Sequence, residues 1–382
     1  MSLRAGTAIA GAAESDLGSA QPGTRPVDLM VQASLRALDD AGLAPRDVDG
    51  LFAATTQLPM APLNLAQDLG IEPRYTDATN VGGSSFMFHV GHARAAIAAG
   101  LCDVALVAYG STQRLVGRGS ASVQELDPWE APFQPVMPLT AYALAASRHM
   151  HEHGTTRAQL AAVAVSARRW AALNPKAWSR DPLTIEDILC SRMVADPLTL
   201  RDCCLVTDGG GAIVLTSAER ARDLRRPPVL VLGAGEAHSH RHLTGMADLT
   251  TTSATHSGAV AFAEARLSPA DVACAQLYDA FTITPILFLE DLGFCAKGEG
   301  GPLVASGATD PGGSLPMNTS GGGLSYCHPG MYGLLAIVEA VRQIRGECGE
   351  RQVPGCEVAL AHGNGGVLSS QATLVLGGPA TA

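Results

Sequence analysis

The sequence predicts an α/β fold of five layers (α-β-α-β-α), formed by two duplicated halves with an inserted loop domain. One observation is an internal repeat that begins at Ala41 and again at Ala265. Each copy has the pattern of a helix end, a Pro-x-Asp-Val turn and a strand, which indicates two halves with the same arrangement of elements. The second is a pair of helices, one in each half, that are apolar nearly all round and must therefore be buried. Short apolar strands accompany both helices, so each is expected to lie between sheets.

Length and composition describe a compact soluble enzyme. The chain has 382 residues, more than one ordinary core holds, with 47% hydrophobic and 16% charged residues. A net charge of −10 argues against a broad surface for nucleic acid or anionic membrane. The nine cysteines are irregularly spaced, and no apolar run approaches the roughly 20 residues that span a bilayer. A reducing, cytoplasmic location without a disulfide framework is expected.

The first half is predicted to cover residues 1–227. In chain order we expect a strand, an amphipathic helix, a buried helix opened by a Gly-Gly-Ser-Ser turn, and a second strand, over Thr7–Ala13, Asp28–Ala41, Gly82–Gly100 and Asp103–Tyr109. Gly42 occupies the usual position for ending the amphipathic helix. The strand Ala212–Thr216 is expected to complete this half.

An insertion of about residues 111–205 interrupts the first half and has no counterpart in the second. It is predicted to hold one helix from about Leu139 to His153 and another from about Arg157 to Leu173. Thr156 and Gln159 have the spacing of a capping box at the start of the second helix. Insertions of this size in α/β folds commonly shape a substrate pocket, and the same role is expected here.

The second half is predicted to cover residues 228–382, after a joint at Arg220–Pro228. Its expected strands and buried helix lie over Val229–Gly233, Met331–Arg345, Glu357–Ala361 and Ala372–Gly377. The helix follows the stretch Asn318–Gly333, around which the site is expected to form. Gly321–Gly323 let the backbone approach a ligand closely, and Tyr326, Cys327 and His328 can all handle protons near neutral pH. The alternative is a glycine-rich surface turn with a capping histidine.

Six phrases of the sequence resemble the thiolase superfamily, and in particular its sterol-carrier-protein type. They are Asn318-Thr-Ser-Gly-Gly, His328-Pro, Gln343-Ile-Arg-Gly-Glu, Arg351-Gln-Val-Pro-Gly, Val358-Ala-Leu-Ala-His-Gly and Pro197-Leu-Thr-Leu-Arg-Asp-Cys-Cys-Leu-Val-Thr-Asp-Gly-Gly. The likeness covers nearly the whole chain. It implies the five-layer thiolase fold, a homodimer and an acyl-coenzyme A thioester as substrate. It also implies no bound cofactor, because the substrate itself carries coenzyme A.

The resemblance also implies where the site residues stand. The nucleophilic cysteine of the family would begin the first buried helix, at Gly83, and the neighbouring Ser84 lacks a base in the family pattern. Tyr278-Asp-Ala-Phe replaces a loop that usually offers Asn or His. His328 is retained, and His362 stands where family members carry Cys or His. Substrate and coenzyme A contacts are expected at Gly83, Ser84, Asn318, Gly322 and Gly365.

Loss of the nucleophile predicts a reaction without a covalent intermediate, because acyl transfer in this family needs a thiolate. Groups that stabilise an enolate remain, and an enolate with a proton-transfer group suits aldol or retro-aldol chemistry. The combination resembles the thiolase-like aldolases of bacterial steroid side-chain degradation, often labelled lipid-transfer proteins. These cleave a β-hydroxyacyl-CoA to a ketone and a short acyl-CoA such as propionyl-CoA. They work with a small DUF35 partner that combines an OB-fold and a zinc ribbon.

Catalytic roles can be assigned as a hypothesis. Tyr278 or Tyr326 removes the proton of the β-hydroxyl, His328 holds the thioester enolate, and His362 or the second tyrosine returns a proton to carbon. An unperturbed tyrosine has a pKa of about 10, so the base needs nearby positive charge or donors, for which His328 is the candidate.

Other interpretations stay open at this point. Cys327, beside His328, could act as a displaced nucleophile for acyl transfer. The chain could instead be a non-catalytic acyl-CoA or sterol carrier in which both tyrosines only pack. No metal site is predicted, because the histidine groups at a helix end and in a polar loop are better explained by the helix dipole and by polarity. These are His149, His151, His153, His238, His240 and His242.

Overall fold

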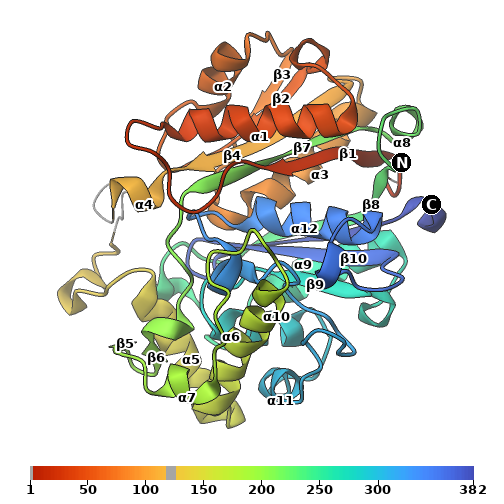
Figure 1. Cartoon of the computed structure of the whole chain (residues 1–382). Helices are drawn as coiled ribbons and strands as arrows, with labels where there is room; N and C mark the ends of the chain where they lie inside the picture. The colour runs from red at the N-terminus through yellow and green to blue at the C-terminus, as the bar shows by residue number, and fades with distance from the viewer. Residues whose placement is uncertain (1–2, 118–125) are drawn as a thin grey trace.

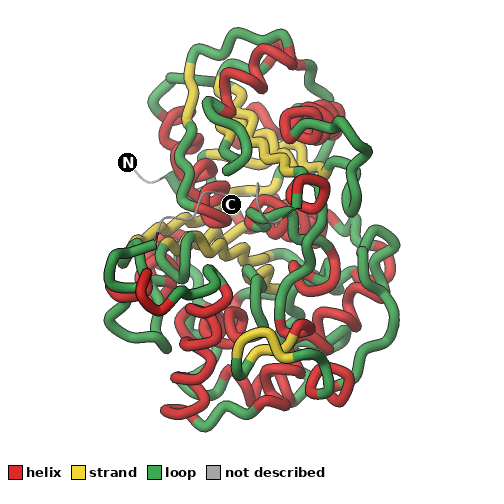
Figure 2. The backbone as a smooth tube through the Cα atoms, turned by 90° about the vertical axis from the view of Figure 1, so that its left-hand side faces the viewer, coloured by secondary structure: helices red, strands yellow, loops and turns green. Residues whose placement is uncertain are grey.

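The computed structural model describes residues 3–117 and 126–382. Two groups of strands lie one above the other with helices α3 (Ser85–Ala98) and α12 (Gly333–Arg345) between them (Figures 1 and 2). Both helices contact strands of both groups. Helix α1 (Pro26–Ala41) covers the outer face of the first group and α9 (Ala254–Ala265) that of the second. The predicted α-β-α-β-α order is confirmed.

The elements of the first half agree with the predicted ones to within a few residues. Its strands are β1, β2, β3, β4 and β7, over Thr7–Glu14, Gly50–Ala53, Tyr75–Asp77, Val104–Ser111 and Gly209–Ser217. A short helix, α2 (Ala61–Leu69), packs beside α1. One helical turn, α8 (Ala218–Ala221), overlaps the start of the predicted joint.

The second half follows the same plan. Its strands β8, β9, β10 and β11 cover Val229–His238, Cys274–Leu277, Val358–Gly365 and Ser370–Gly377. Two helices, α10 (Ile283–Asp291) and α11 (Gly300–Ala305), follow β9. The order β3-β2-β4-β7-β1-β8-β11-β10-β9 is hydrogen-bonded throughout, because β1 meets β8 at two antiparallel residue pairs. The sequence does not predict this join, which links the sheets of the two halves into one ladder.

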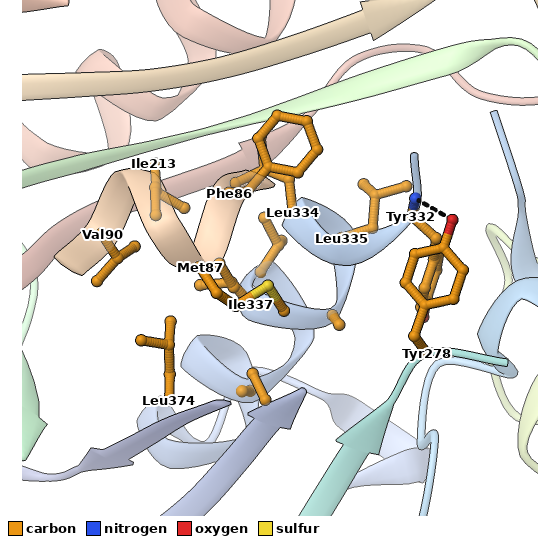
Figure 3. Close-up of a cluster of buried hydrophobic side chains, with 14 of the residues drawn as sticks. Phe86, Met87, Val90, Ile213, Tyr278, Tyr332, Leu334, Leu335, Ile337 and Leu374 are labelled. Carbon is orange, nitrogen blue, oxygen red and sulfur yellow. Dashed lines mark hydrogen bonds between the residues drawn. The ribbon is translucent and has the colours of Figure 1, made fainter. Parts of the chain in front are cut away.

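The two central helices touch at their N-terminal ends, and this contact sets the position of the site. A side chain on Gly333, the first residue of α12, would collide with the backbone oxygen of Gly83. Farther along, Phe86 and Met87 of α3 face Leu334 and Ile337 of α12 (Figure 3). Helix α12 begins two residues later than predicted, because Gly322–Tyr326 form a π-helical turn and an irregular segment separates that turn from the helix.

The insertion leaves the first half but packs against the second (Figure 1). Its helices are α4, α5, α6 and α7, over Gln113–Val116, Leu139–His153, Arg157–Ala172 and Ile185–Leu189, and strands β5 (Met193–Ala195) and β6 (Leu198–Thr199) form a small hairpin. The predicted capping box is present, since Thr156 and Gln159 exchange side-chain to backbone hydrogen bonds. Helices α5 and α6 both contact α10, and α6 also contacts the π-helical turn.

The state of the cysteines and the character of the helices can be compared with what composition led us to expect. All nine cysteines are free thiols. Among residues 3–117 and 126–382, none of the helices has the length and apolar character needed to cross a membrane.

Candidate active site

Tyr278 and His328 meet where the two halves join. Tyr278 follows β9, and its hydroxyl lies 3.1 Å from Nε2 of His328, with the two rings at 88°. The same phenol oxygen accepts the backbone N–H of Tyr332 at 3.2 Å (Figure 3) and lies 3.1 Å from the carbonyl oxygen of Gly330. Because the N–H of Tyr332 can only donate, the phenol proton is directed to His328 or Gly330.

The charge state of the pair differs from the one expected. Burial lowers the pKa of His328 to about 4, so the ring is neutral at pH 7. Burial likewise raises the pKa of Tyr278 well above its usual value. A positive charge on His328 therefore does not assist the tyrosine at pH 7, because desolvation of the imidazole opposes its protonation. That His328 assists the tyrosine as a hydrogen-bond donor stays a prediction. A neutral imidazole can accept the phenol proton when that proton is directed to Nε2 of His328 instead of to the carbonyl oxygen of Gly330.

The ring of Tyr278 fills the space that a side chain at position 83 would need. A Cβ added to Gly83 would overlap Cε2 of Tyr278, lie 2.6 Å from its Cζ, and lie 2.7 Å from the backbone oxygen of Asn364. Contacts this short cannot be accommodated without movement of the ring or the backbone. The ring of Tyr278 therefore leaves no room for a side chain at position 83.

Asp279 anchors the glycine-rich loop. Its Oδ1 accepts the backbone N–H of Gly323 at 2.6 Å and its Oδ2 that of Leu324 at 3.2 Å. Gly322 has φ +60, and a Cβ there would collide with the same carboxyl group. Burial raises the pKa of Asp279 to about 7. Asn318, at φ 52, accepts the N–H of Leu277 at 2.7 Å through Oδ1. Gly322 and Asn318 therefore shape the loop on which His328 stands.

Tyr326 lies in a different environment from the Tyr278–His328 pair. It lines a surface cavity of about 480 Å³ together with Arg342 and Lys176. Burial raises its pKa well above the usual value, and the nearby carboxylate of Glu14 adds to this. Of the two candidate tyrosines, the structure brings only Tyr278 to His328.

His362 is not where its predicted role requires it to be. Its ring lies against Phe288, with Nδ1 2.9 Å from Oγ1 of Thr373 and Nε2 3.0 Å from Oε1 of Gln371. Successive residues of a strand point to opposite faces of a sheet. The residue of β10 that faces α3 is Gly363, where a Cβ would lie 2.8 Å from Cα of Ser84. His362 thus points away from α3. Return of a proton to the enolate by His362 or by the second tyrosine stays a prediction.

The remaining predicted residues are engaged elsewhere. The hydroxyl of Ser84 lies 2.9 Å from that of Ser370 in a buried contact. A side chain on Gly365 would collide with the carbonyl oxygen of Val81, so this glycine permits a close backbone approach. Cys327 is buried, and burial raises the pKa of its thiol well above the usual value. A protonated, enclosed thiol is a poor nucleophile.

Four residues of the site were not predicted from the sequence. Tyr332 stacks on His328 at 14° and supplies the N–H that binds Tyr278. Tyr109 donates its hydroxyl to the carbonyl of Pro329 at 2.5 Å and accepts the N–H of Met331 at 3.0 Å. The third is Asp279, described above. The fourth is Tyr142, which enters from α5 of the insertion. Asp279 and Tyr332 stand within or beside phrases that the sequence highlights, whereas Tyr109 and Tyr142 depend on packing between distant segments.

His149, at the helix end, makes hydrogen bonds of a structural kind. Nδ1 of His149 lies 2.8 Å from Oγ1 of Thr155 and its Nε2 lies 2.9 Å from Oε2 of Glu290. In the part of the chain that the structure describes, no three His, Cys, Asp or Glu side chains gather as a metal site would require.

Buried histidines predict a measurable acid sensitivity. Burial lowers the pKa of His89 to about 4, as it does for His328, below the 6.5 of an exposed histidine. Between these pKa values only the unfolded chain binds the proton, so each such residue lowers the free energy of unfolding as the pH falls, by about 2 kcal/mol at pH 5. The free energy of unfolding of His89→Leu should therefore rise by about 2 kcal/mol relative to that of the parent chain when the pH is lowered from 7.5 to 5. Denaturant titrations at the two pH values measure this difference. If the free energies of unfolding of the variant and the parent chain changed equally with pH, this prediction would be wrong.

Comparison with the parent is needed because Asp279 acts in the opposite direction. Its folded pKa of about 7 lies above the unfolded value. The folded chain therefore binds the extra proton, and this carboxyl group favours folding as the pH falls below 7.

Comparisons with known proteins identify the family of this chain. Residues 235–378 match the family model "Thiolase C-terminal domain-like". The steroid side-chain-cleaving aldolase of Thermomonospora curvata is 38% identical, over 90% of this chain and 91% of its own length. The 17-hydroxy-3-oxo-4-pregnene-20-carboxyl-CoA lyase of Mycobacterium tuberculosis is also 38% identical, over 97% and 98%. An acetyl-CoA acetyltransferase of Methanothermobacter thermautotrophicus is 36% identical, over 89% and 91%.

A solved structure leads to the same group. The Ltp2–ChsH2(DUF35) aldolase superimposes with a TM-score of 0.89 at 35% identity, covering 98% of both chains. The chain therefore belongs to the thiolase superfamily, among the sterol-carrier-protein-type thiolase-like proteins that include the steroid side-chain-cleaving aldolases.

Proposed function

We propose that this chain is an aldolase-type carbon–carbon lyase that performs retro-aldol cleavage of a β-hydroxyacyl-CoA. The products are a ketone and a short acyl-CoA such as propionyl-CoA, and a steroid side-chain thioester is the proposed substrate. The observation that carries the proposal is the ring of Tyr278 in the space beside Gly83. A phenol hydrogen-bonded to a neutral imidazole stands where acyl transfer would need a thiol. Identity alone does not decide between lyase and acetyltransferase relatives, but this exchange favours the lyase.

The pair can move one proton through a complete reaction. The substrate hydroxyl gives its proton to the oxygen of Tyr278 while the phenol proton passes to Nε2 of His328, 3.1 Å away. The electron pair of the O–H bond forms the ketone carbonyl, and the bond between Cα and Cβ breaks. Its electrons form an enolate across Cα and the thioester oxygen. The proton then returns from His328 through Tyr278 to Cα, which gives the acyl-CoA and the starting state of the pair.

The high pKa of Tyr278 suits this scheme. A relay does not require a free tyrosinate in the resting enzyme, because His328 accepts a proton only as the phenol gains one. Burial keeps His328 neutral and ready to accept at pH 7. His362 has no direct part in these steps, and Tyr326 is not needed for them.

Further parts of the proposal concern the assembly. The chain is proposed to act as a homodimer and together with a small DUF35 protein that carries an OB-fold and a zinc ribbon. The similarity to the Ltp2–ChsH2(DUF35) aldolase supports the second component. Coenzyme A is proposed to enter only as part of the substrate.

The decisive experiment combines the purified chain, with and without the co-purified partner, with a β-hydroxyacyl-CoA that carries a tertiary hydroxyl. Mass spectrometry of the products should show a ketone and a shortened acyl-CoA in equal amounts. An acyl adduct on Cys327 in the intact protein would instead support acyl transfer. Tight binding without either product, with and without the partner, would support a carrier.

A further inference from the structure

We propose that Tyr142 of the insertion is a second catalytic phenol, whose hydroxyl donates to the thioester oxygen of the substrate and of the enolate. A chain of buried side chains, His362–Gln371–Asn364, orients it. The inference rests on the proposed function, because it assigns a role within that reaction. It also gives His362 an indirect part as a positioning residue.

The direction of every hydrogen bond along the series His362–Gln371–Asn364 follows from one backbone carbonyl. The oxygen of Leu368 can only accept, and it lies 3.0 Å from Nε2 of Gln371, which is therefore the amide nitrogen. The same nitrogen donates to Oδ1 of Asn364 at 2.8 Å. Oε1 of Gln371 must then accept from Nε2–H of His362, at 3.0 Å. Nδ1 of that ring is left to accept from the hydroxyl of Thr373, at 2.9 Å.

This polarity determines what Tyr142 can do. Since Oδ1 of Asn364 accepts, its Nδ2 donates to the phenol oxygen of Tyr142, at 2.7 Å. The phenol is an acceptor in that bond, so its own proton points elsewhere. The phenol oxygen also accepts a hydrogen bond from the backbone of Leu368, and neither of these two bonds within residues 3–117 and 126–382 uses the phenol proton. Burial raises the pKa of Tyr142 to about 12, so the proton stays on the oxygen at pH 7. A buried donor without an acceptor points to a ligand.

Tyr142 is placed at the same site as Tyr278. Its ring stacks on Phe281 at 4.4 Å, three residues after Tyr278. Its hydrogen-bond partner Asn364 contributes the backbone oxygen that lies 2.7 Å from a Cβ built on Gly83. The two phenols are close enough to interact electrostatically, because a deprotonated Tyr142 would raise the pKa of Tyr278. Tyr278, the proposed base, and Tyr142, the proposed donor, thus approach Gly83 from two different elements.

A fixed, protonated donor is what the enolate step requires. Charge develops on the thioester oxygen as the bond between Cα and Cβ breaks, and a donor already oriented toward that oxygen binds the transition state more tightly than the substrate. Loss of one such donor lowers kcat by about 10²–10³-fold.

Tyr142→Phe tests the role while keeping the ring that stacks on Phe281. We expect a decrease in kcat of about 10²–10³-fold with little change in KM. Asn364→Asp should have a similar effect, because a carboxylate can only accept and would take the phenol proton. The double variant should be no slower than either single one, since both remove the same donor. Tyr75→Phe, on the edge strand β3, is the matched control and should keep full activity.

Infrared difference spectroscopy of bound [1-¹³C]propionyl-CoA tests the same donor without turnover. The carbonyl stretch should shift to lower frequency in the parent chain and move back in Tyr142→Phe. An identical carbonyl band in both proteins would overturn the inference, whether or not the chain releases a ketone. Absence of ketone from the parent chain, with the band shift retained, would reject the proposed function and leave the assignment of the donor standing.

Discussion

Tyr278→Phe is expected to lower kcat by about 10²–10⁴-fold, the usual contribution of one general acid–base group. The variant keeps the ring that fills the space beside Gly83, so the shape of the site should be preserved. It loses the hydroxyl that links the substrate to Nε2 of His328, and neutral His328 then has no route to the proton. Substrate affinity should change little, because the lost interaction acts mainly in the transition state. Steady-state assay of ketone release measures both quantities.

The control for this variant separates chemistry from folding. Removal of the hydroxyl leaves the buried N–H of Tyr332 without its acceptor, which should cost about 1–3 kcal/mol of stability. Ser84→Ala removes a buried hydroxyl contact to Ser370, at a comparable cost, but touches neither member of the pair. We expect Ser84→Ala to lose stability and keep its activity. Similar loss of kcat in both variants would mean that Tyr278 acts only through packing.

Much of the fold could be predicted from local patterns. The repeated phrase at Ala41 and Ala265 and the two apolar helices led to the five layers, because burial of such helices leaves few alternatives. The join between β1 and β8 could not be predicted, since two residue pairs leave no signal in either strand. The start of α12 was misplaced because a π-helical turn has no clear sequence signature.

The site was predictable only where one residue type decides the chemistry. The glycine at position 83 and the phenol at Tyr278 can both be read from the sequence, but only the coordinates show that the ring of Tyr278 fills the space beside Gly83. His362 was assigned by motif position, whereas the phase of β10 decides which face a side chain reaches. Tyr142 lies far from Gly83 and Tyr278 in sequence, and the packing of α5 on α10 brings it near them.

Gly83→Cys, which introduces the residue that the thiolase resemblance implies at this position, is expected to abolish cleavage without creating a thiolase. The new Cβ would overlap the ring of Tyr278, and Asn364 and Gly333 limit movement of the backbone on either side. The ring would have to leave its hydrogen bond to His328, so we expect at least a 10²-fold loss of kcat. Overpacking of this kind also costs about 1–3 kcal/mol of stability. Ketone release and calorimetry measure the two effects.

Gly91→Ala is the matched control for this substitution, because it adds a Cβ to the same helix at a position with no other atom within 4 Å. It should leave activity unchanged and stabilise α3 by up to about 1 kcal/mol. A double-mutant cycle then identifies the cause of the defect: Gly83→Ala should cost much less stability when Tyr278 is replaced by Ala, since the overlapping ring is gone. If the two costs simply add, the ring does not occupy the space at Gly83 in solution. The ring of Tyr278 beside Gly83 would then fail as the physical basis proposed for the lyase.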